Sequence, residues 1–388
     1  MPRDSFLDDH AEAVLTIDLD AIVANYRLIA ARLAPGCKPG AVVKADAYGL
    51  GAAPVGLKIE AEGCRHFFVA TVDEGLALRH TFEDATPGEV SEILVLSGPS
   101  KTSAPYFAHG WLTPVLNSME QVETWRNFAA EMGRPLSAAL HVDTGMSRLG
   151  LAPADYHLLS ANPDLLAGII PRLVMSHLAC ADEPGHPMNT DQRTAFEAMA
   201  ARFPGVERSL ANSAGTLLGK DFHLEMVRPG IALYRPEPLT DRTRTLSESV
   251  VLKGDIVQVR QIDLPQTVGY GASHRATGPT RIATVPVGYA DGYPRGLSNA
   301  GFAIVDGIRV PVVGRVSMDL ITLDVSAVPP TRCTVGTQAT LLGEGIDIDD
   351  LADAAGTISY EILTHLGQRY HRVYKGAVDP RPRGPASV

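Results

Sequence analysis

Short apolar runs alternate with longer amphipathic stretches from about residue 15 to residue 230. After Asp18, apolar residues repeat every three or four positions, which predicts an amphipathic helix that ends before Pro35. Eight short apolar runs predict buried strands, at residues 41–43, 66–70, 93–96, 113–116, 138–143, 172–177, 208–212 and 225–228. Helical patterns lie between them, at residues 52–62, 73–83, 118–132 and 189–203.

This alternation predicts an α/β fold, a (β/α)8 TIM barrel, for the N-terminal domain. Parallel strands need crossover helices, and eight such strands close into a barrel. An open doubly wound sheet is the alternative. Its dinucleotide-binding form is disfavoured, because no Gly-x-Gly-x-x-Gly follows the first predicted strand.

A second domain begins after a polar, proline-bearing stretch at residues 235–246. Beyond it, strand patterns dominate, at residues 249–262, 281–287, 302–305, 309–313, 320–325 and 338–342. Helices are expected at 348–355 and 360–366. We therefore expect a barrel domain over 15–240 and a mostly-β C-terminal domain over 241–388, which also includes residues 1–14. The last residues, from Asp379, resemble a frayed tail.

Composition limits the classes of function. The net charge of −10 and the pI near 5.6 argue against nucleic acid or an anionic membrane as the main partner. We expect no signal peptide and no membrane span, and hence a cytoplasmic protein. The scattered cysteines suggest reduced thiols and no metal site: they are Cys37, Cys64, Cys180 and Cys333.

Polar and cationic residues stand at the carboxyl ends of five predicted strands, where barrel enzymes place their chemistry. They are Lys44, Asp143 leading to Arg148, His177, Asn212-Ser213 and Arg228 with Gly230-Ile231. Strands that merely end in polar residues would explain one or two of these positions, but not all five. A catalytic site is predicted at this end of the barrel.

Lys44 indicates the kind of chemistry. By itself, a lysine at the exit of a buried strand more often points to water. Its chemical use would be as an amine in a partly desolvated pocket, where the neutral form can attack a carbonyl. The loops after the seventh and eighth strands carry small residues, as in the usual phosphate site of this fold. An amine and a phosphate site together suggest a phosphorylated aldehyde cofactor, of which pyridoxal 5′-phosphate is the common case.

Three other residues are less decisive by themselves. In isolation, His177 is read more readily as a hydrogen-bonded core histidine than as a catalytic one. Arg228 follows a buried strand and needs a specific acceptor. Tyr270 is flanked by glycines, which indicates a tight exposed turn. It matters only if the site needs a second acid or base.

Nine motifs along residues 42–361 occur in the order found in alanine racemases. They are VVKADAYGLG, HVDTGMSRLG, MSHLACAD, NSAGTL, MVRPGIALY, VGYGASH, VPVGYADGYPR, RVSMD and ISYE. The chain thus resembles that family, which implies a pyridoxal-phosphate-dependent isomerase that interconverts L- and D-alanine. It also implies a homodimer with shared active sites. The product would supply D-alanine for peptidoglycan, or the enzyme would permit D-alanine catabolism.

The resemblance also implies residue roles. Lys44 would bind the cofactor covalently and act as one base, and Tyr270 of the other subunit would act as the opposite base, hydrogen-bonded to His177. Arg228 would face the pyridine nitrogen, and Arg148 the phenolic oxygen. Around the phosphate would lie Tyr48, Asn212, Ser213, Gly230 and Ile231. The substrate side and entry would be formed by Met318, whose N–H receives the carboxylate, with Asp319 and Tyr289.

Two positions depart from the family pattern. Many members have a modified lysine where this chain has His141, which leaves the orientation of Arg148 open. Gln368 takes the place of a tyrosine that some members set against the phosphate, with Tyr370 close by. The alternatives to alanine racemisation are a racemase of serine or a basic amino acid on the same scaffold, and a non-catalytic protein that binds the cofactor.

Overall fold

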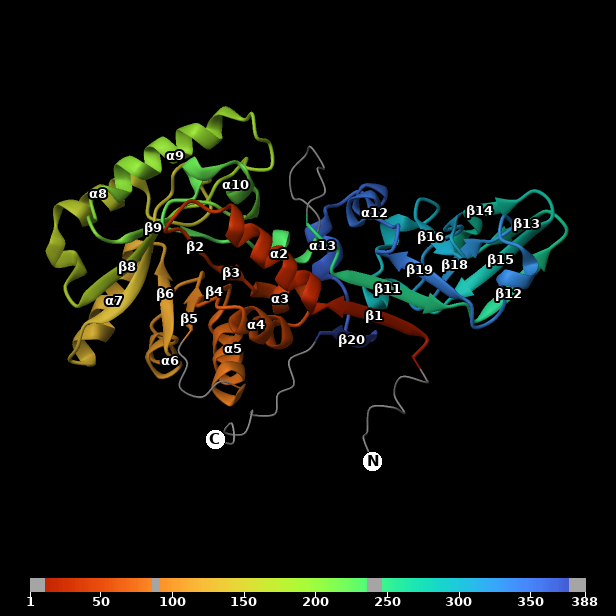
Figure 1. The fold of residues 1–388 in the computed structure, drawn as a ribbon, viewed down its shortest axis with the longest axis horizontal. Coiled ribbons are helices and arrows are strands. Elements are labelled where there is room, and N and C mark those ends of the chain that lie inside the picture. The colour runs from red at the N-terminus through yellow and green to blue at the C-terminus, as the bar shows by residue number, and fades with distance from the viewer. Residues whose placement is uncertain (1–10, 86–90, 236–245, 377–388) are drawn as a thin grey trace. The chain divides into compact units, whose positions relative to one another are not determined.

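The computed structural model describes residues 11–85, 91–235 and 246–376 (Figure 1). Its contacts divide the chain into two compact units. Of the described residues, the barrel unit comprises 20–47, 51–85, 91–235 and 246–247, and the β unit comprises 11–19, 48–50 and 248–376. The expected domain limits at 14/15 and 240/241 stay predictions, and the second of them falls in 236–245, outside the described residues.

Seven parallel strands form the main sheet of the barrel unit, in chain order. They are β3 (Ala41–Val42), β4 (His66–Val69), β5 (Glu92–Val95), β6 (Leu112–Leu116), β7 (Leu136–His141), β8 (Ile169–Met175) and β9 (Glu207–Ser209). The eighth strand, β10 (Met226–Val227), pairs in parallel with β2 (Lys38–Pro39), which runs into β3. The Arg228 N–H also donates to the Ala211 carbonyl at 2.9 Å, next to β9. The predicted eight-stranded barrel is confirmed.

Helices follow the strands and cover the sheet, as Figure 1 shows. The longer ones are α2 (Leu19–Arg32), α4 (Ala52–Ala61), α5 (Val72–Ala85), α7 (Met119–Glu131), α8 (Pro153–Ala161) and α9 (Pro187–Ala200); the shorter ones are α6 (Ala104–His109), α10 (Ser213–Leu217) and α11 (Ile231–Tyr234), with 3-10 turns η1 (Pro163–Leu166) and η2 (Lys220–Phe222). Ser118 caps α7, since its side chain accepts from the Gln121 N–H. Phe67 and Phe68 alternate on β4, and both are fully buried.

The β unit is built on a six-stranded sheet in the order β17-β16-β19-β11-β1-β20. A three-stranded sheet, β12-β15-β18, and a hairpin, β13-β14, complete it. Its strands are β1 (Ala13–Asp18), β11 (Val250–Asp255), β12 (Gln258–Ile262), β13 (Gln266–Val268), β14 (His274–Ala276), β15 (Thr280–Val285), β16 (Phe302–Val305), β17 (Ile308–Pro311), β18 (Ile321–Asp324), β19 (Gln338–Leu342) and β20 (His371–Lys375). Its helical elements are α12 (Ile348–Ala355), α13 (Ser359–Thr364) and the turns η3 (Tyr270–Ala272), η4 (Tyr289–Asp291), η5 (Arg295–Leu297) and η6 (Pro330–Arg332). The expected mostly-β character is confirmed.

Membrane spans, metal sites and cysteines are the remaining features of the described residues. No helix in the described part of the chain has the length and hydrophobicity to cross a membrane. Within residues 11–85, 91–235 and 246–376, no group of three or more His, Cys, Asp or Glu side chains could hold a metal ion. All four cysteines are free thiols.

Candidate active site

Lys44 is the first residue of α3 (Lys44–Gly49), and one residue, Val43, separates it from β3. The next four residues all have positive φ, between 52° and 57°, although none of them is glycine: they are Ala45, Asp46, Ala47 and Tyr48. Left-handed backbone costs an L-residue about 1–2 kcal/mol. This one-turn left-handed element is therefore strained backbone beside the predicted catalytic amine, as is found at functional sites.

Side chains hold this turn in place. Glu74 accepts from the Ala45 N–H at 2.8 Å with one carboxylate oxygen, and from the Ala70 N–H at 2.7 Å with the other. Asp46 accepts from the Ala52 N–H at 2.6 Å. Glu74 thus joins the turn after β3 to the end of β4. Sequence analysis missed Glu74, because a glutamate in the first turn of a helix has an ordinary explanation as a capping residue.

The Lys44 amine is largely removed from water. Burial lowers its pKa, the positive charge of Arg148 lowers it further, Glu74 opposes the shift, and Arg228 adds to it. Each nearby guanidinium disfavours a second positive charge on the amine. Lys44 therefore has the lowered pKa expected of a nucleophilic amine.

Arg228 is 4% exposed and lies at the end of β10. It donates to Ser209 Oγ at 2.5 Å, to the Ser176 carbonyl at 2.6 Å and to the Leu210 carbonyl at 3.4 Å. No carboxylate of the described residues forms an ion pair with it. Burial lowers its pKa to about 9, so it stays charged at neutral pH. The predicted buried guanidinium is thus fixed by neutral acceptors alone.

His177 follows β8, and its Nδ1 lies 3.4 Å from Arg228 Nη2. Because a guanidinium can only donate, Nδ1 is the acceptor and Nε2 carries the proton of the neutral ring. Burial sets the pKa of His177 well below its ordinary value, and the charges of Arg228, Arg148 and Lys44 lower it further. His177 is therefore a neutral donor through Nε2.

His141 ends β7, and its Nδ1 lies 2.7 Å from Asn117 Oδ1. The Asn117 amide donates to the carbonyls of Leu96 and Val115 at 2.9 and 3.0 Å, which fixes its oxygen toward the ring. Nδ1 of His141 is thus the donor, and Nε2 is left as an acceptor. Burial, with Arg228 as the next cause, lowers its pKa to about 4. A neutral ring stands here, in place of the modified lysine of many family members.

The loops after β9 and β10 are joined by one hydroxyl. Ser213 Oγ accepts from the Gly230 N–H at 2.8 Å and from the Ala232 N–H at 3.2 Å. Asn212 caps α10 by accepting from the Gly215 N–H at 2.9 Å. Ile231 is the first residue of α11, so no carbonyl of that helix can reach its N–H. The predicted phosphate residues of the barrel unit therefore lie together.

The other predicted site residues belong to the β unit: they are Tyr48, Tyr270, Tyr289, Met318 and Asp319. Tyr48 is 8% exposed, with its ring centroid 6.1 Å from that of Tyr360. Tyr270 is 73% exposed, on the turn between β13 and β14. Its two neighbours, Gly269 and Gly271, have φ of 73° and 67°, as the predicted glycine-flanked turn requires.

The segment containing Met318 is tied to the turn at Tyr289. The N–H groups of Tyr289 and Ala290 donate to the carbonyls of Ser317 and Met318, both at 3.0 Å. Arg369 then bridges two carboxylates, Asp291 at 3.1 Å and Asp319 at 2.8 Å. Arg369 and Asp291 are positioning residues that sequence analysis missed. Gln368, beside Arg369, is exposed.

The barrel residues suit a phosphorylated aldehyde. The strand ends offer a poorly hydrated amine, two guanidinium groups, a neutral imidazole and backbone N–H groups. The chemistry of this donor set fits an anionic cofactor with a carbonyl, and all of these groups except Arg148 are buried or half-buried. Pyridoxal 5′-phosphate meets each requirement.

Comparisons with known proteins agree with this geometry. Residues 17–238 match the family model of the alanine racemase N-terminal domain, and 249–374 that of the C-terminal domain. An alanine racemase of Rhodospirillum rubrum is 50% identical over 95% of this chain and 97% of its own. A catabolic alanine racemase of Agrobacterium fabrum is 46% identical over 94% and 92%.

A solved structure is also similar. The alanine racemase of Bartonella henselae, with covalently bound pyridoxal phosphate, has a TM-score of 0.89 and 38% identity, covering 94% of this chain and 99% of its own. Both family models and both full-length relatives lead to one conclusion. The chain belongs to the alanine racemase family.

Proposed function

We propose that this protein interconverts L- and D-alanine by a two-base mechanism with pyridoxal 5′-phosphate as its cofactor. The observation that carries the proposal is the half-buried Lys44 amine, with its lowered pKa, at the carboxyl end of β3. Family membership supports the reaction, and the donor set at the strand ends supports the cofactor.

The residues that would hold the cofactor divide by function. Lys44 would form the covalent link. Asn212, Ser213, Gly230 and Ile231 would surround the phosphate, with Tyr48. Arg228 would donate to the ring nitrogen and Arg148 would face the phenolic oxygen. When bound, the cofactor makes the α-hydrogen of the amino acid acidic.

Racemisation needs a proton removed from one face of the α-carbon and another delivered to the opposite face. One side chain cannot easily reach both faces, so two bases solve the geometry. Lys44 is one base and Tyr270 the other. His177 donates through Nε2 to the Tyr270 oxygen, which favours its phenolate form. A neutral His177 can make this donation without adding a charge next to Arg228.

The substrate would be held through its carboxylate. The Met318 N–H and Arg148 bind that carboxylate, and Asp319 and Tyr289 line the entry. Large side chains around the site favour a methyl-sized substrate. We infer that two copies of the chain form a homodimer in the cytoplasm, each site combining Lys44 of one subunit with Tyr270 of the other.

Racemase assays test this function directly. Purified protein is incubated with L-alanine, L-serine, L-lysine and L-arginine, and the D-product is measured by chiral chromatography. We expect alanine to react fastest, and Lys44→Ala and Tyr270→Phe each to lose at least about a thousandfold in kcat. Faster turnover of serine or a basic amino acid would identify the other racemase class. No turnover of any substrate by the cofactor-loaded protein would support a non-catalytic binding protein.

A further inference from the structure

A second cavity lies at the opposite end of the barrel strands from Lys44. Its volume is about 530 Å³, within the range of small-molecule sites. It is lined by the first residues of four strands, since β4 begins at His66, β5 at Glu92, β6 at Leu112 and β7 at Leu136. The catalytic residues described above stand at the carboxyl ends, so this cavity is separate from the active site.

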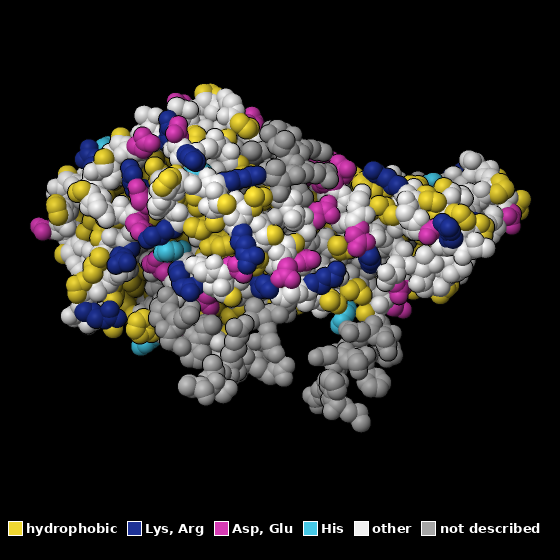
Figure 2. All heavy atoms as spheres, viewed as in Figure 1, with side chains coloured by type: hydrophobic (Ala, Val, Ile, Leu, Met, Phe, Trp, Pro, Cys, Tyr) yellow, Lys and Arg dark blue, Asp and Glu magenta, His cyan; other side chains and the backbone are white. Residues whose placement is uncertain are grey.

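The lining is strongly cationic in a chain of net charge −10. The lining includes a single glutamate, Glu92, and four arginines: Arg65, Arg79, Arg134 and Arg172. Burial lowers the pKa of His66, which favours its neutral form, although Glu92 opposes the shift. Figure 2 shows Lys and Arg side chains gathered around a histidine on the part of the barrel where Figure 1 labels β2, β4 and β6.

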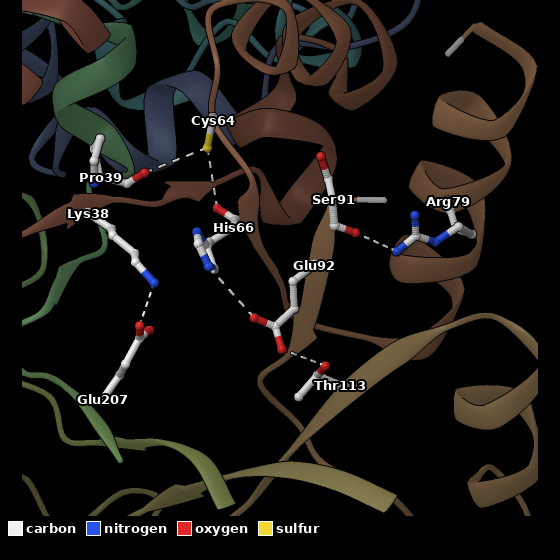
Figure 3. Close-up of polar contacts among 9 residues, drawn as sticks. All are labelled: Lys38, Pro39, Cys64, His66, Arg79, Ser91, Glu92, Thr113 and Glu207. Carbon is white, nitrogen blue, oxygen red and sulfur yellow. Dashed lines mark hydrogen bonds and ion pairs between the residues drawn. The ribbon is translucent and has the colours of Figure 1, made fainter. Parts of the chain in front are cut away.

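Carboxylates act on one of the four arginines, because the negative charges of Glu83 and Glu60 favour the charged form of Arg79. The two carboxylates drawn in Figure 3 are engaged by other groups. Glu92 accepts from the Thr113 hydroxyl at 2.9 Å and lies 3.9 Å from His66. Glu207 forms an ion pair with Lys38. The side chains of Arg134 and Arg172 form no hydrogen bond or ion pair with any residue of the described ranges. The cavity thus holds two guanidinium groups with free donors.

Arg172 lies at a register shift between β7 and β8. Ala138 of β7 is opposite Pro171 of β8, but Ala139 is opposite Leu173, so Arg172 is the extra residue of a β-bulge. Bulges redirect a side chain and are enriched next to functional sites. The resulting position of Arg172 is close enough to His66 for its charge to contribute to the lowered pKa of that histidine.

An aromatic side chain stands beside these cations. Trp111 is 70% exposed and has a φ of 50°, which is unusual for a bulky residue. Buried Arg79 holds this backbone by donating to the carbonyls of Gly110 and Trp111 at 3.4 and 3.2 Å, and to that of Ser91 at 2.6 Å. An exposed indole in a strained, anchored backbone is a surface on which a planar ring can stack.

We propose that this cavity binds an organic anion that carries a planar ring. Arg134 and Arg172 hold the anionic group, and Trp111 stacks against the ring. A guanidinium fork suits phosphate and carboxylate equally, and stacking is tolerant of ring identity. The ligand class is therefore a ring-bearing phosphate or carboxylate, such as a nucleotide or an aromatic acid.

Tryptophan fluorescence tests this proposal, because the chain has only two tryptophans, Trp111 and Trp125, and both line the cavity. The cofactor-loaded enzyme is titrated with adenosine monophosphate, so that the phosphate site at the other end of the barrel is already filled. Inorganic phosphate and adenosine serve as probes with only the anion or only the ring. We expect a saturable fluorescence change with the nucleotide, and at least tenfold weaker binding of either partial probe.

Variants locate the binding. Arg134→Gln and Arg172→Gln should each weaken nucleotide binding about tenfold, and Arg172→Lys should weaken it less. Arg27→Gln is the control, an exposed arginine of α2 paired with Glu62. Thermal melts establish that each variant is folded. Because Trp111→Leu removes one of the two fluorescent tryptophans, nucleotide binding to this variant is measured by calorimetry. The proposal is wrong if no probe saturates, if phosphate binds as tightly as the nucleotide, or if Arg27→Gln weakens binding as much as Arg172→Gln.

Discussion

Three individual residues, Lys44, Arg148 and Arg228, can carry positive charge at the end of the barrel strands. The Lys44 amine is half-buried near the positive charges of Arg148 and Arg228, which makes a further charge on the amine costly. The amine is the group that can give up its proton, because a guanidinium holds its own far more strongly. The charges at the strand ends therefore support the proposal that Lys44 is a base.

Removing the positive charge of Arg228 should partly reverse the lowering of the Lys44 pKa. Arg228→Gln takes away a positive charge that lowers the pKa of Lys44, so that pKa should rise. The measurement is the pH dependence of acetylation of Lys44 in cofactor-free protein, followed by mass spectrometry. The midpoint should move to higher pH, whereas Arg27→Gln should leave it unchanged. An unmoved midpoint in a folded Arg228→Gln protein would contradict this electrostatic coupling.

His141 makes stability depend on pH. Its pKa is about 4 in the folded chain and near 6.5 in the unfolded one, so between these values the unfolded chain binds a proton that the folded chain does not. Folding stability should therefore fall as the pH drops through this window. His141→Gln should lose less stability than the wild type between pH 7 and pH 5, as measured by urea unfolding. An equal loss of stability in His141→Gln and in the wild type over this range would contradict the role of His141.

At the scale of elements, the turn after Lys44 has a left-handed backbone that its non-glycine residues disfavour. Ala45 is exposed and has a φ of 53°, a region that glycine adopts without the steric cost of a Cβ. Ala45→Gly should raise the free energy of unfolding by about 1 kcal/mol. It should also lower kcat, because the adjacent amine becomes less constrained. Ala61→Gly, at an exposed alanine in the last turn of α4, is the control, and should destabilise instead.

The loops after β9 and β10 depend on one hydroxyl. Ser213→Ala leaves the buried N–H groups of Gly230 and Ala232 without an acceptor, which should cost about 1–3 kcal/mol of stability. Ser213→Ala should also lower the affinity for the cofactor, since the same loops would surround its phosphate. Thermal melts and cofactor titration measure the two effects. Ser160→Ala on α8 should change neither, and equal losses in both variants would count against a specific role of Ser213.

Local patterns predicted most elements of the barrel, because each strand there is a short apolar run with a helix after it. The pattern failed where pairing, rather than local sequence, decides the structure. β20 (His371–Lys375) is half polar, and it becomes a strand because β1 lies beside it. The hairpin strands β13 and β14 have only three residues each, too short for a visible alternation.

The site residues also divide into those that local sequence indicates and those that depend on contacts in the folded chain. The placement of Lys44, His177 and Arg228 near one another could be predicted, because the barrel topology brings the carboxyl ends of strands together. Asn117 and Glu74 could not be predicted, because their roles depend on contacts made only in the folded chain. Asn117 hydrogen-bonds the His141 ring, and Glu74 accepts from two backbone N–H groups. The second cavity also escaped prediction. Arginines at the amino ends of strands have the ordinary explanation of solvent exposure.

At the scale of the whole molecule, the two proposed bases belong to different compact units, Lys44 to the barrel unit and Tyr270 to the β unit. If each site takes them from two subunits, mixed dimers restore activity. Inactive Lys44→Ala and Tyr270→Ala proteins, once they exchange subunits, should recover about one quarter of wild-type activity, since half of the dimers are mixed and each has one intact site. No recovery after subunit exchange proven by mass spectrometry would mean that both bases come from one chain.

The position of β1 affects how the chain folds during synthesis. β1 lies between β11 and β20 in the six-stranded sheet, and its residues Leu15 and Ile17 are fully buried in the folded protein. Yet β11 begins only at Val250, more than 230 residues after β1 ends. At 5–20 residues per second, β1 waits roughly 10–50 seconds on the ribosome for its first partner. All eight barrel strands emerge in that interval, so the barrel can fold while β1 stays exposed to chaperones and to other nascent chains.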